Sequence, residues 1–280
     1  MQTDDINQAI QTNIRAALAE DLGSGDLTAQ LIPADHQAQA TLIAREAAVL
    51  CGRPWFEACF TALDPSIQFQ WLVSEGQDFA ANTTLCEISG NARAILSAER
   101  PALNFLQTLS ATASTTRRYV QAISGTTALI MDTRKTLPGL RLAQKYAVKI
   151  GGGANQRIGL FDGVLIKENH IASAGSIATA LAAAERQTPP GFSIQIEVET
   201  LNELEQALAA GAKLILLDNF DLDQLRTAVQ LTNKRAALEA SGGIGLENVR
   251  AIAECGVDRI SIGGLTKHVQ AVDFSLRVNI

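Results

Sequence analysis

The sequence predicts an α/β protein, in which an α+β N-terminal domain precedes an incomplete α/β barrel of six or seven strands. Three observations predict this fold. From about Thr126 onward, short apolar runs end repeatedly in polar residues or glycines. Alanine-rich segments with helical periodicity separate these runs, and such alternation is typical of a parallel sheet covered by helices. A complete eight-unit barrel takes about 250 residues, so the roughly 150 residues available hold only six or seven shortened units.

The N-terminal half mixes helix and strand patterns. Apolar residues recur every four positions over 6–18 and predict an amphipathic helix that ends at the Gly-Ser-Gly turn 23–25. A strand is expected near 40–50, and strict alternation predicts a half-buried strand over 67–73. A further short strand is expected over 85–88. Together these elements predict a small α+β domain.

The segment 92–123 has a helical composition, but Pro101 lies inside it. Because proline lacks the N–H that a helix interior requires, an interruption is expected there. The strands of the barrel are predicted within six apolar runs: 128–135, 163–170, 193–199, 214–219, 237–243 and 259–265. The predicted helices between them are 177–187, 201–210, 222–231 and 246–255. We assign the N-terminal domain to residues 1–115 and the barrel to 116–271, with 272–280 as a candidate to return to the N-terminal domain.

Composition argues against several classes of function. The formal net charge is -6 at pH 7, and phosphate-backbone binding requires a broad basic face, so no nucleic-acid partner is expected. No apolar run approaches the roughly 20 residues that span a bilayer, and the N-terminus lacks a signal-peptide pattern. The four cysteines show no CxxC spacing and the three histidines are scattered, so neither a disulfide framework nor a zinc site is expected. These features predict a cytoplasmic protein without a membrane partner.

One stretch of this acidic chain, residues 131–170, is rich in cations and glycines. Its cations are Arg134, Lys135, Arg141, Lys145, Lys149 and Arg157. Between positions 132 and 161 the only acid is Asp132. Cations gathered in one place of an acidic protein indicate an anion-binding site, and the glycines 151–153 let a ligand approach the backbone. For the three cations at helical spacing, 141, 145 and 149, a solvated helix face remains an alternative. The cations that favour a site are Arg134, Lys135 and Arg157.

Polar residues also end the successive apolar runs. They are Asp132, Arg134, Lys135, Lys167, Glu197, Glu199, Asp218, Asn219, Glu239, Ser241 and Gly263. In α/β barrels the site lies at the carboxyl ends of the strands. The sequence therefore predicts a ring of converging charged groups at one end of the barrel.

Two parts of this ring suggest phosphate and metal binding. Paired glycines at 242–243 and 263–264 would offer backbone N–H groups to a phosphate, with a plain tight turn as the alternative. Glu197 and Asp218 end neighbouring strands, and carboxylate oxygens without a nearby histidine suit Mg²⁺. The alternative for these carboxylates is that they balance the charge of Lys167. Together the parts predict a polyphosphorylated sugar and a second, acidic substrate.

Several motifs resemble one enzyme family across nearly the whole chain. In the C-terminal half they are DTRKTLPGLR, KYAVKIGGGANQR, LIKENH, IEVE, LLDN, SGG and GLTKHVQ. In the N-terminal half they are EDLGSGDLT and ERPALNFLQ. On these motifs the chain resembles the quinolinate phosphoribosyltransferases, the carboxylating nicotinate-nucleotide pyrophosphorylases, which are type II phosphoribosyltransferases.

The resemblance implies a fold, a reaction and an assembly. The fold would be an N-terminal α/β sandwich packed on an incomplete α/β barrel, in a homodimer or a larger oligomer with shared active sites. The reaction would join quinolinate to phosphoribosyl pyrophosphate with Mg²⁺ as cofactor. It would release CO₂ and pyrophosphate and yield nicotinate mononucleotide for NAD synthesis.

The resemblance also implies roles for individual residues. Quinolinate carboxylates would be held by Arg134, Arg157 and Lys167, with Arg100 supplied by the partner chain. Lys135 would lie beside the pyrophosphate and quinolinate, and Glu197 and Asp218 would serve Mg²⁺ and the ribose hydroxyls. The 5′-phosphate would be held by Ser241, Gly242, Gly243, Gly263 and Gly264. The catalytic residues would be Lys135, Lys167, Glu197 and Asp218. Many members have a histidine where this chain has Gln156, so a cationic role for that position is in doubt here, although Gln156 could hydrogen-bond a carboxylate.

Three other functions remain open at the level of sequence. The nearest is a paralogue of the same fold that acts on another substrate, as in molybdenum-transport-associated relatives, although the full set of pocket cations argues against it. A Schiff-base aldolase that uses Lys167 would belong to another class of enzyme. A binding module for a phosphorylated ligand would not be an enzyme at all. Turnover of phosphoribosyl pyrophosphate distinguishes the transferase from the binding module.

Overall fold

A computed structural model describes residues 3–279 and forms two compact units. The first unit comprises Met1–Arg117, Thr136–Gly152 and Thr266–Ile280, and the second comprises Arg118–Lys135 and Gly153–Leu265. Residues 136–152, which the sequence-based interpretation assigned to the barrel, thus belong to the first unit.

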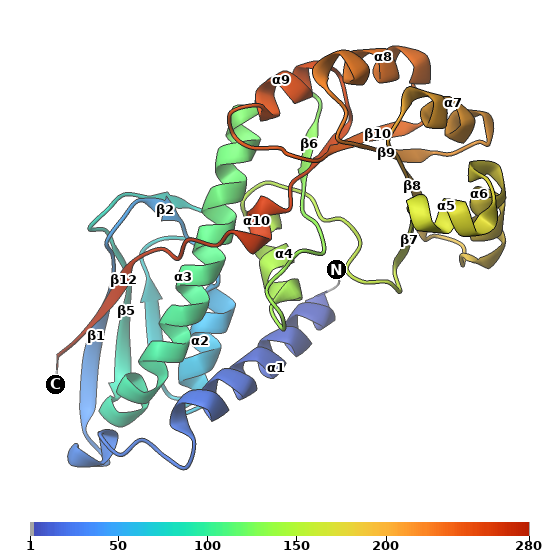
Figure 1. Cartoon of the computed structure of the whole chain (residues 1–280). Coiled ribbons are helices and arrows are strands. Elements are labelled where there is room, and N and C mark those ends of the chain that lie inside the picture. The colour runs from blue at the N-terminus through green and yellow to red at the C-terminus, as the bar shows by residue number, and fades with distance from the viewer. Residues whose placement is uncertain (1–2, 280) are drawn as a thin grey trace. The chain divides into compact units, whose positions relative to one another are not determined.

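The first unit contains a four-stranded antiparallel sheet with the strand order β12-β1-β5-β3 (Figure 1). Its strands are β1 (Gln37–Ala44), β3 (Gln68–Trp71), β5 (Thr84–Asn91) and β12 (Phe274–Asn279). A separate two-stranded sheet pairs β2 (Ala48–Val49) with β4 (Asp78–Phe79). Alternate residues of β1 are buried, because an antiparallel sheet of this kind packs one face on its core.

The helices of the first unit supply most of that core. They are α1 (Thr3–Leu22), α2 (Arg53–Thr61), α3 (Ala92–Ala122) and α4 (Arg141–Ile150), with a 3-10 turn η1 (Ala29–Leu31). The predicted N-terminal helix is confirmed, and its buried residues Ile10 and Ile14 lie one turn apart. Trp55, Phe56 and Phe60 of α2 are fully buried and form the aromatic centre of the unit.

The predicted interruption at Pro101 is wrong, because α3 continues through this residue for 31 residues in all. A proline in a helix interior costs about 3 kcal/mol. The buried stripe of α3 continues past Pro101 with Leu103, Leu106 and Leu109, each at most 2% exposed. Burying one leucine contributes about 2 kcal/mol, so tertiary packing of this stripe outweighs the local cost.

The second unit contains a six-stranded parallel sheet with the order β6-β11-β10-β9-β8-β7. Its strands are β6 (Leu129–Met131), β7 (Gly163–Ile166), β8 (Ser193–Val198), β9 (Leu214–Asp218), β10 (Ala237–Ser241) and β11 (Arg259–Ser261). Each strand lies inside one of the six predicted apolar runs, so all six strand predictions are confirmed. β6 and β7 are the edge strands, and Ala154 forms an isolated parallel bridge to Met131 of β6.

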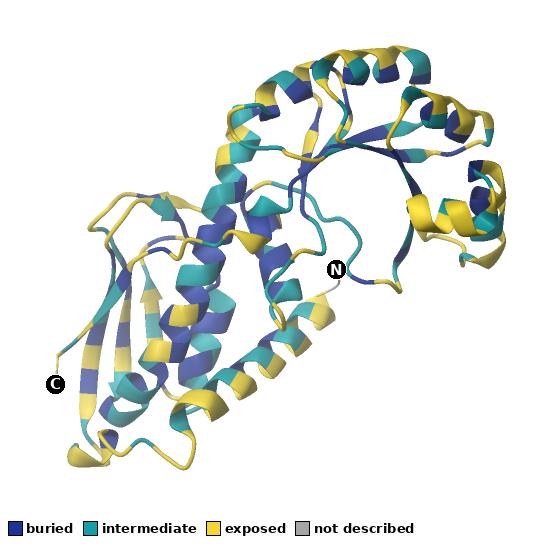
Figure 2. Ribbon diagram, viewed as in Figure 1, coloured by how far each residue is buried: buried dark blue, intermediate teal, exposed yellow. Residues whose placement is uncertain are grey.

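Helices follow the strands of the second unit, and α6 to α9 each combine buried with exposed residues, whereas α5 has no buried residue (Figure 2). They are α5 (Glu168–Ala174), α6 (Ile177–Gln187), α7 (Leu201–Ala209), α8 (Leu222–Thr232) and α9 (Val249–Glu254), and α10 (Gly264–Lys267) follows β11. The side chains of Ser176, Thr200 and Asp221 accept hydrogen bonds from backbone N–H groups in the first turns of α6, α7 and α8. These N-caps explain why the three helices begin where they were predicted. The fourth predicted helix, 246–255, is shorter than expected.

The cations at helical spacing on α4 are not all exposed to solvent. Lys145 is fully buried and Lys149 is exposed, while the Arg141 guanidinium donates to Thr136 Oγ1 at 3.1 Å. The solvated alternative therefore fits Lys149 and does not fit Lys145. No helix among residues 3–279 is long and apolar enough to cross a membrane.

Candidate active site

The carboxyl ends of the six parallel strands bring distant parts of the second unit to one edge of its sheet. Asp218 at the end of β9 pairs with Ser241 at the end of β10, and Met131 of β6 pairs with Ser261 of β11. Since parallel strands end on the same side, the polar residues that follow them converge, as the sequence predicted. All of the predicted site residues except Arg100 belong to this unit.

Two guanidinium groups lie near each other beyond β6. The pKa of Arg157 is lowered by burial and, next, by the positive charge of Arg134, while Asp162 acts in the opposite direction. Arg157 Nη1 also donates to the carbonyl of Gly163 at 2.8 Å. Like charges held together in a partly buried place repel each other, and an anionic ligand would relieve that repulsion.

Asp132 anchors the loop that carries Arg157. It is fully buried, and its carboxylate accepts hydrogen bonds from Asn155 Nδ2 at 2.6 Å and from the backbone N–H of Gln156 at 2.8 Å. The sequence placed Asp132 in the ring of site groups. The structure gives its carboxylate a supporting role, because it holds the segment that precedes Arg157.

A second buried carboxylate is that of Glu239, which lies in β10 and is fully buried. It accepts from the carboxamide nitrogens of Gln156 and Gln195, the latter at 3.1 Å. Burial raises its pKa, and the hydrogen bonds from Gln195, Gln156 and Ser261 oppose that effect. The sequence-based reasoning did not single out Gln195. A polar residue at the centre of the apolar run SIQIEVE was the available signal.

The raised pKa of Glu239 predicts how the free energy of unfolding changes with pH. The native state holds the carboxyl proton more tightly than the unfolded chain, in which the pKa of a glutamate is near its ordinary value of 4.5. Stability from this group is therefore present at low pH and is lost as pH rises through the window between 4.5 and the raised folded pKa. Urea unfolding at a series of pH values should show this decline in the wild type and not in Glu239→Gln. Parallel pH profiles of the two proteins would contradict the assignment.

Lys167 and Glu197 form a close ion pair at the ends of β7 and β8. Lys167 Nζ lies 2.8 Å from Oε1 and 2.6 Å from Oε2 of Glu197. The lysine side chain is 44% exposed and the glutamate side chain only 10% exposed, so the carboxylate is the more deeply held partner. The proposed alternative, in which a carboxylate balances Lys167, is thus what the structure shows for Glu197.

Two carboxylates at these strand ends are candidate ligands for Mg²⁺. Glu197 and Asp218 supply the oxygen ligands that Mg²⁺ prefers. Among the residues that the structure describes, however, no group of three or more His, Cys, Asp or Glu residues is placed to hold a metal ion. The chemistry therefore fits an ion that keeps much of its water and arrives with the phosphates of a substrate.

Close contacts leave little room for a side chain at Gly242 and Gly263, one in each glycine turn. Gly242 has φ 97°, and a Cβ there would overlap Asn219 Oδ1, so a side chain is excluded on both counts. A Cβ on Gly263 would lie 2.9 Å from Cδ of Lys135, so this lysine lies directly over the end of β11. Lys135 and both glycine turns thus belong to one surface at the strand ends. Arg100 is exposed on α3 in the first unit.

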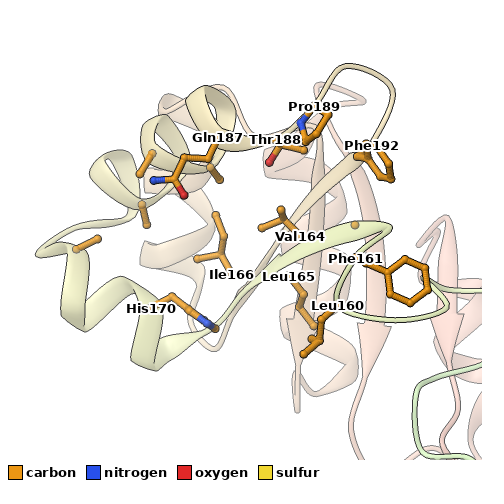
Figure 3. Close-up of a pocket in the computed structure, with 15 residues that line it drawn as sticks. Leu160, Phe161, Val164, Leu165, Ile166, His170, Gln187, Thr188, Pro189 and Phe192 are labelled. Atoms are coloured by element: carbon orange, nitrogen blue, oxygen red, sulfur yellow. The ribbon is translucent and has the colours of Figure 1, made fainter.

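A cavity of about 410 Å³ lies elsewhere, between β7 and α6 (Figure 3). Figure 3 shows Leu160, Val164, Ile166 and Phe192 among its lining side chains. None of the predicted site residues lines it, and its lining includes no lysine or arginine. A site for an acidic substrate requires cations, so this cavity is not the reaction site.

A parallel α/β sheet whose strand ends gather guanidinium groups, lysines, carboxylates and glycine turns defines an enzyme-type site for phosphorylated and carboxylated ligands. Comparison with known families identifies the particular group. The family model "Quinolinate phosphoribosyl transferase, N-terminal domain" matches residues 26–110, and the corresponding C-terminal domain model matches residues 112–277. The chain belongs to the quinolinate phosphoribosyl transferase family.

Individual relatives agree with this assignment. The chain is 41% identical over 264 residues to a probable carboxylating nicotinate-nucleotide pyrophosphorylase of Synechocystis, covering 93% of this chain and 90% of the relative. It is 41% identical to the carboxylating nicotinate-nucleotide pyrophosphorylase of Mycobacterium leprae, covering 96% of each chain. A solved nicotinate-nucleotide pyrophosphorylase from Francisella tularensis superposes with a TM-score of 0.94 at 47% identity, covering 98% of this chain and 97% of that one.

Proposed function

We propose that the protein transfers the phosphoribosyl group of phosphoribosyl pyrophosphate to quinolinate, with decarboxylation, and so makes nicotinate mononucleotide for NAD synthesis. The observation that carries this proposal is the pair of neighbouring guanidinium groups, Arg134 and Arg157, in the same unit as Lys167. Three cations exceed what a single carboxylate requires and match a dicarboxylate. The carboxylating relatives bear the corresponding name.

Each substrate has its own part of the strand-end surface. Arg134, Arg157 and Lys167 bind the two carboxylates of quinolinate. Backbone N–H groups of the glycine turns hold the 5′-phosphate, at Ser241, Gly242, Gly243, Gly263 and Gly264. Lys135, which lies over Gly263, supplies positive charge to the pyrophosphate.

Glu197 and Asp218 bind the ribose hydroxyls and would hold a Mg²⁺ ion that comes with the pyrophosphate. The ion would supply a counter-charge for the leaving group. Lys167 Nζ donates to both carboxylate oxygens of Glu197, so the lysine and this carboxylate lie beside each other in the site.

The chemistry requires no covalent intermediate with the protein. The pyridine nitrogen forms a bond to C1 of the ribose as the bond from C1 to the pyrophosphate oxygen breaks. The ribosylated ring is then cationic, and it stabilises the electron pair left on C2 when the 2-carboxylate departs as CO₂. A proton on C2 completes the product. The contribution of the chain is to orient both substrates and to stabilise the charges that develop.

The direct test incubates the purified protein with Mg²⁺, phosphoribosyl pyrophosphate and quinolinate. We expect nicotinate mononucleotide, CO₂ and pyrophosphate in equal amounts. Absence of the mononucleotide would refute the proposed function and favour the paralogue or the binding module. Borohydride trapping of a carbonyl substrate on Lys167 would instead support the aldolase.

The carboxylates at the strand ends make a prediction about metal dependence. Glu197→Gln and Asp218→Asn are each expected to raise the Mg²⁺ concentration needed for half-maximal rate, and to slow turnover by about tenfold or more, because each helps to place the metal and pyrophosphate. Initial rates over a Mg²⁺ titration measure both effects. Glu205→Gln removes an exposed carboxylate of α7 and serves as the matched control. Unchanged Mg²⁺ dependence in both variants would refute the role.

The proposal includes an assembly and a location. The protein acts as a homodimer in the cytoplasm, and Arg100 of one subunit completes the quinolinate site of the other. Support for the shared site is the exposure of Arg100 on α3, outside the unit that carries the other site residues.

A further inference from the structure

Glu239, Gln156 and Gln195 form a hydrogen-bonded polar cluster inside the second unit. Glu239 is fully buried, and Gln195 is only 4% exposed. Gln156 Nε2 donates to Glu239 Oε1 and also lies 3.4 Å from Gln195 Oε1, while Gln195 Nε2 donates to Glu239 Oε2. Burying a carboxylate is costly unless it is hydrogen-bonded, so such a cluster stays in a fold when its geometry has a use or when every member is satisfied.

The cluster turns the Gln156 carboxamide inward. Its nitrogen has two acceptors within the cluster, Glu239 Oε1 and Gln195 Oε1. The backbone N–H of the same residue donates to Asp132 Oδ1. Gln156 is thus held from two directions, by a carboxylate at the end of β6 and by a carboxylate of β10. Because both its main chain and its side chain are hydrogen-bonded, the position of Gln156 is restrained.

That neighbour is Arg157, whose guanidinium is repelled by Arg134. The Arg157 guanidinium donates to the carbonyl of Gly163 at 2.8 Å, and its position also depends on the backbone segment that carries it. The contact between Gln156 and Glu239 is a restraint on the adjacent residue, which keeps Arg157 near Arg134 before any ligand arrives. Groups held in place beforehand bind their ligand without the cost of ordering them.

We propose that Glu239 is a positioning residue for the quinolinate site, which acts by holding the Gln156 carboxamide and through it Arg157. This inference rests on the proposed function for its ligand. Glu239 itself touches no substrate. The geometry assigns it a task that is separate from phosphoribosyl binding, because the glycine turns and Lys135 are not part of the cluster.

The test measures the dissociation constant of quinolinate by calorimetry, without phosphoribosyl pyrophosphate. Glu239→Gln keeps the shape of the side chain but turns an N–H₂ group toward at least one of the donors Gln156, Gln195 and Ser261. An unpaired buried donor is expected to weaken quinolinate binding about tenfold. Gln156→Leu should weaken it by a similar factor, and the double variant should bind no more weakly than Gln156→Leu alone. The KM for phosphoribosyl pyrophosphate should stay within about twofold of wild type, and Glu205→Gln should change neither value.

A merely structural role predicts other results. Losses for both substrates, or losses that add in the double variant, would overturn the proposal, as would an unchanged quinolinate affinity in Glu239→Gln. If Glu239→Gln does not fold, Gln156→His decides the matter. Its ring N–H keeps a donor for Glu239, so it should retain the affinity that Gln156→Leu loses, and equal losses would overturn the proposal.

A second measurement separates this inference from the proposed function. Amide hydrogen exchange over residues 153–163 should be faster in Glu239→Gln than in the wild type without any ligand, since one anchor of the loop is gone. Unchanged exchange overturns the positioning role. Faster exchange in a protein that forms no mononucleotide would retain the role of Glu239 while the proposed function fails.

Discussion

Nicotinate in place of quinolinate is expected to lower kcat/KM by at least about a hundredfold. The reason is that the substrate site has more positive charge than the single carboxylate of nicotinate requires. Arg157 is partly buried and repelled by Arg134, so an anionic ligand beside the two guanidinium groups would be stabilised. Nicotinate lacks the 2-carboxylate, and its binding would leave one buried cation unmatched. The measurement is the initial rate of mononucleotide formation at several concentrations of each acid.

The discrimination should depend on the guanidinium groups themselves. Arg157→Met keeps much of the side-chain volume and removes the charge, so kcat/KM for quinolinate should fall steeply while the low value for nicotinate changes little. The ratio of the two values should therefore shrink. Comparable turnover of nicotinate by the wild-type protein would show that the surplus of cations has another purpose.

Mixing two inactive variants is expected to restore about a quarter of the wild-type activity. The variants are Arg100→Ala and Lys167→Ala. If each site takes Arg100 from one subunit and Lys167 from the other, one site of a mixed dimer receives both defects and the second receives none. With free exchange from equal amounts, about half of the dimers are mixed, which leaves about a quarter of all sites intact. The measurement is the rate after mixing, with exchange followed by native mass spectrometry.

The design includes a control for folding. Arg100 is exposed, so its removal takes no side chain from the core. Lys167→Ala, however, leaves the 10% exposed carboxylate of Glu197 without its cation. Arg157→Ala is therefore used as a second variant of the same unit, and mixing it with Arg100→Ala should give the same quarter. No recovery despite confirmed exchange would show that each site uses one chain only.

Much of the second unit could be predicted from local patterns. The apolar runs and the alanine-rich periodic segments between them depend on residues close in sequence, so they predicted the six strands and the helices α6, α7 and α8. The caps Ser176, Thr200 and Asp221, which are also local, were found only in the structure. The strand ends also led to the candidate site, because the carboxyl ends of parallel strands must lie at one edge. The continuation of α3 through Pro101 was missed for the opposite reason. Its stability comes from packing, which a local rule does not contain.

What only the tertiary structure decided is the task of each buried polar group. The sequence by itself determined that Asp132, Glu197 and Glu239 follow or lie in strands, that Gln156 comes after a glycine run, and that cations gather near them. It did not determine that Glu239 meets Gln156 across 83 residues and Gln195 across 44, or that Glu197 is held by Lys167. Periodicity places a side chain on a face of its own strand. Its partner and its exposure to water depend on which distant strands pack beside it, and these decide whether a carboxylate binds a ligand or supports the residue that does.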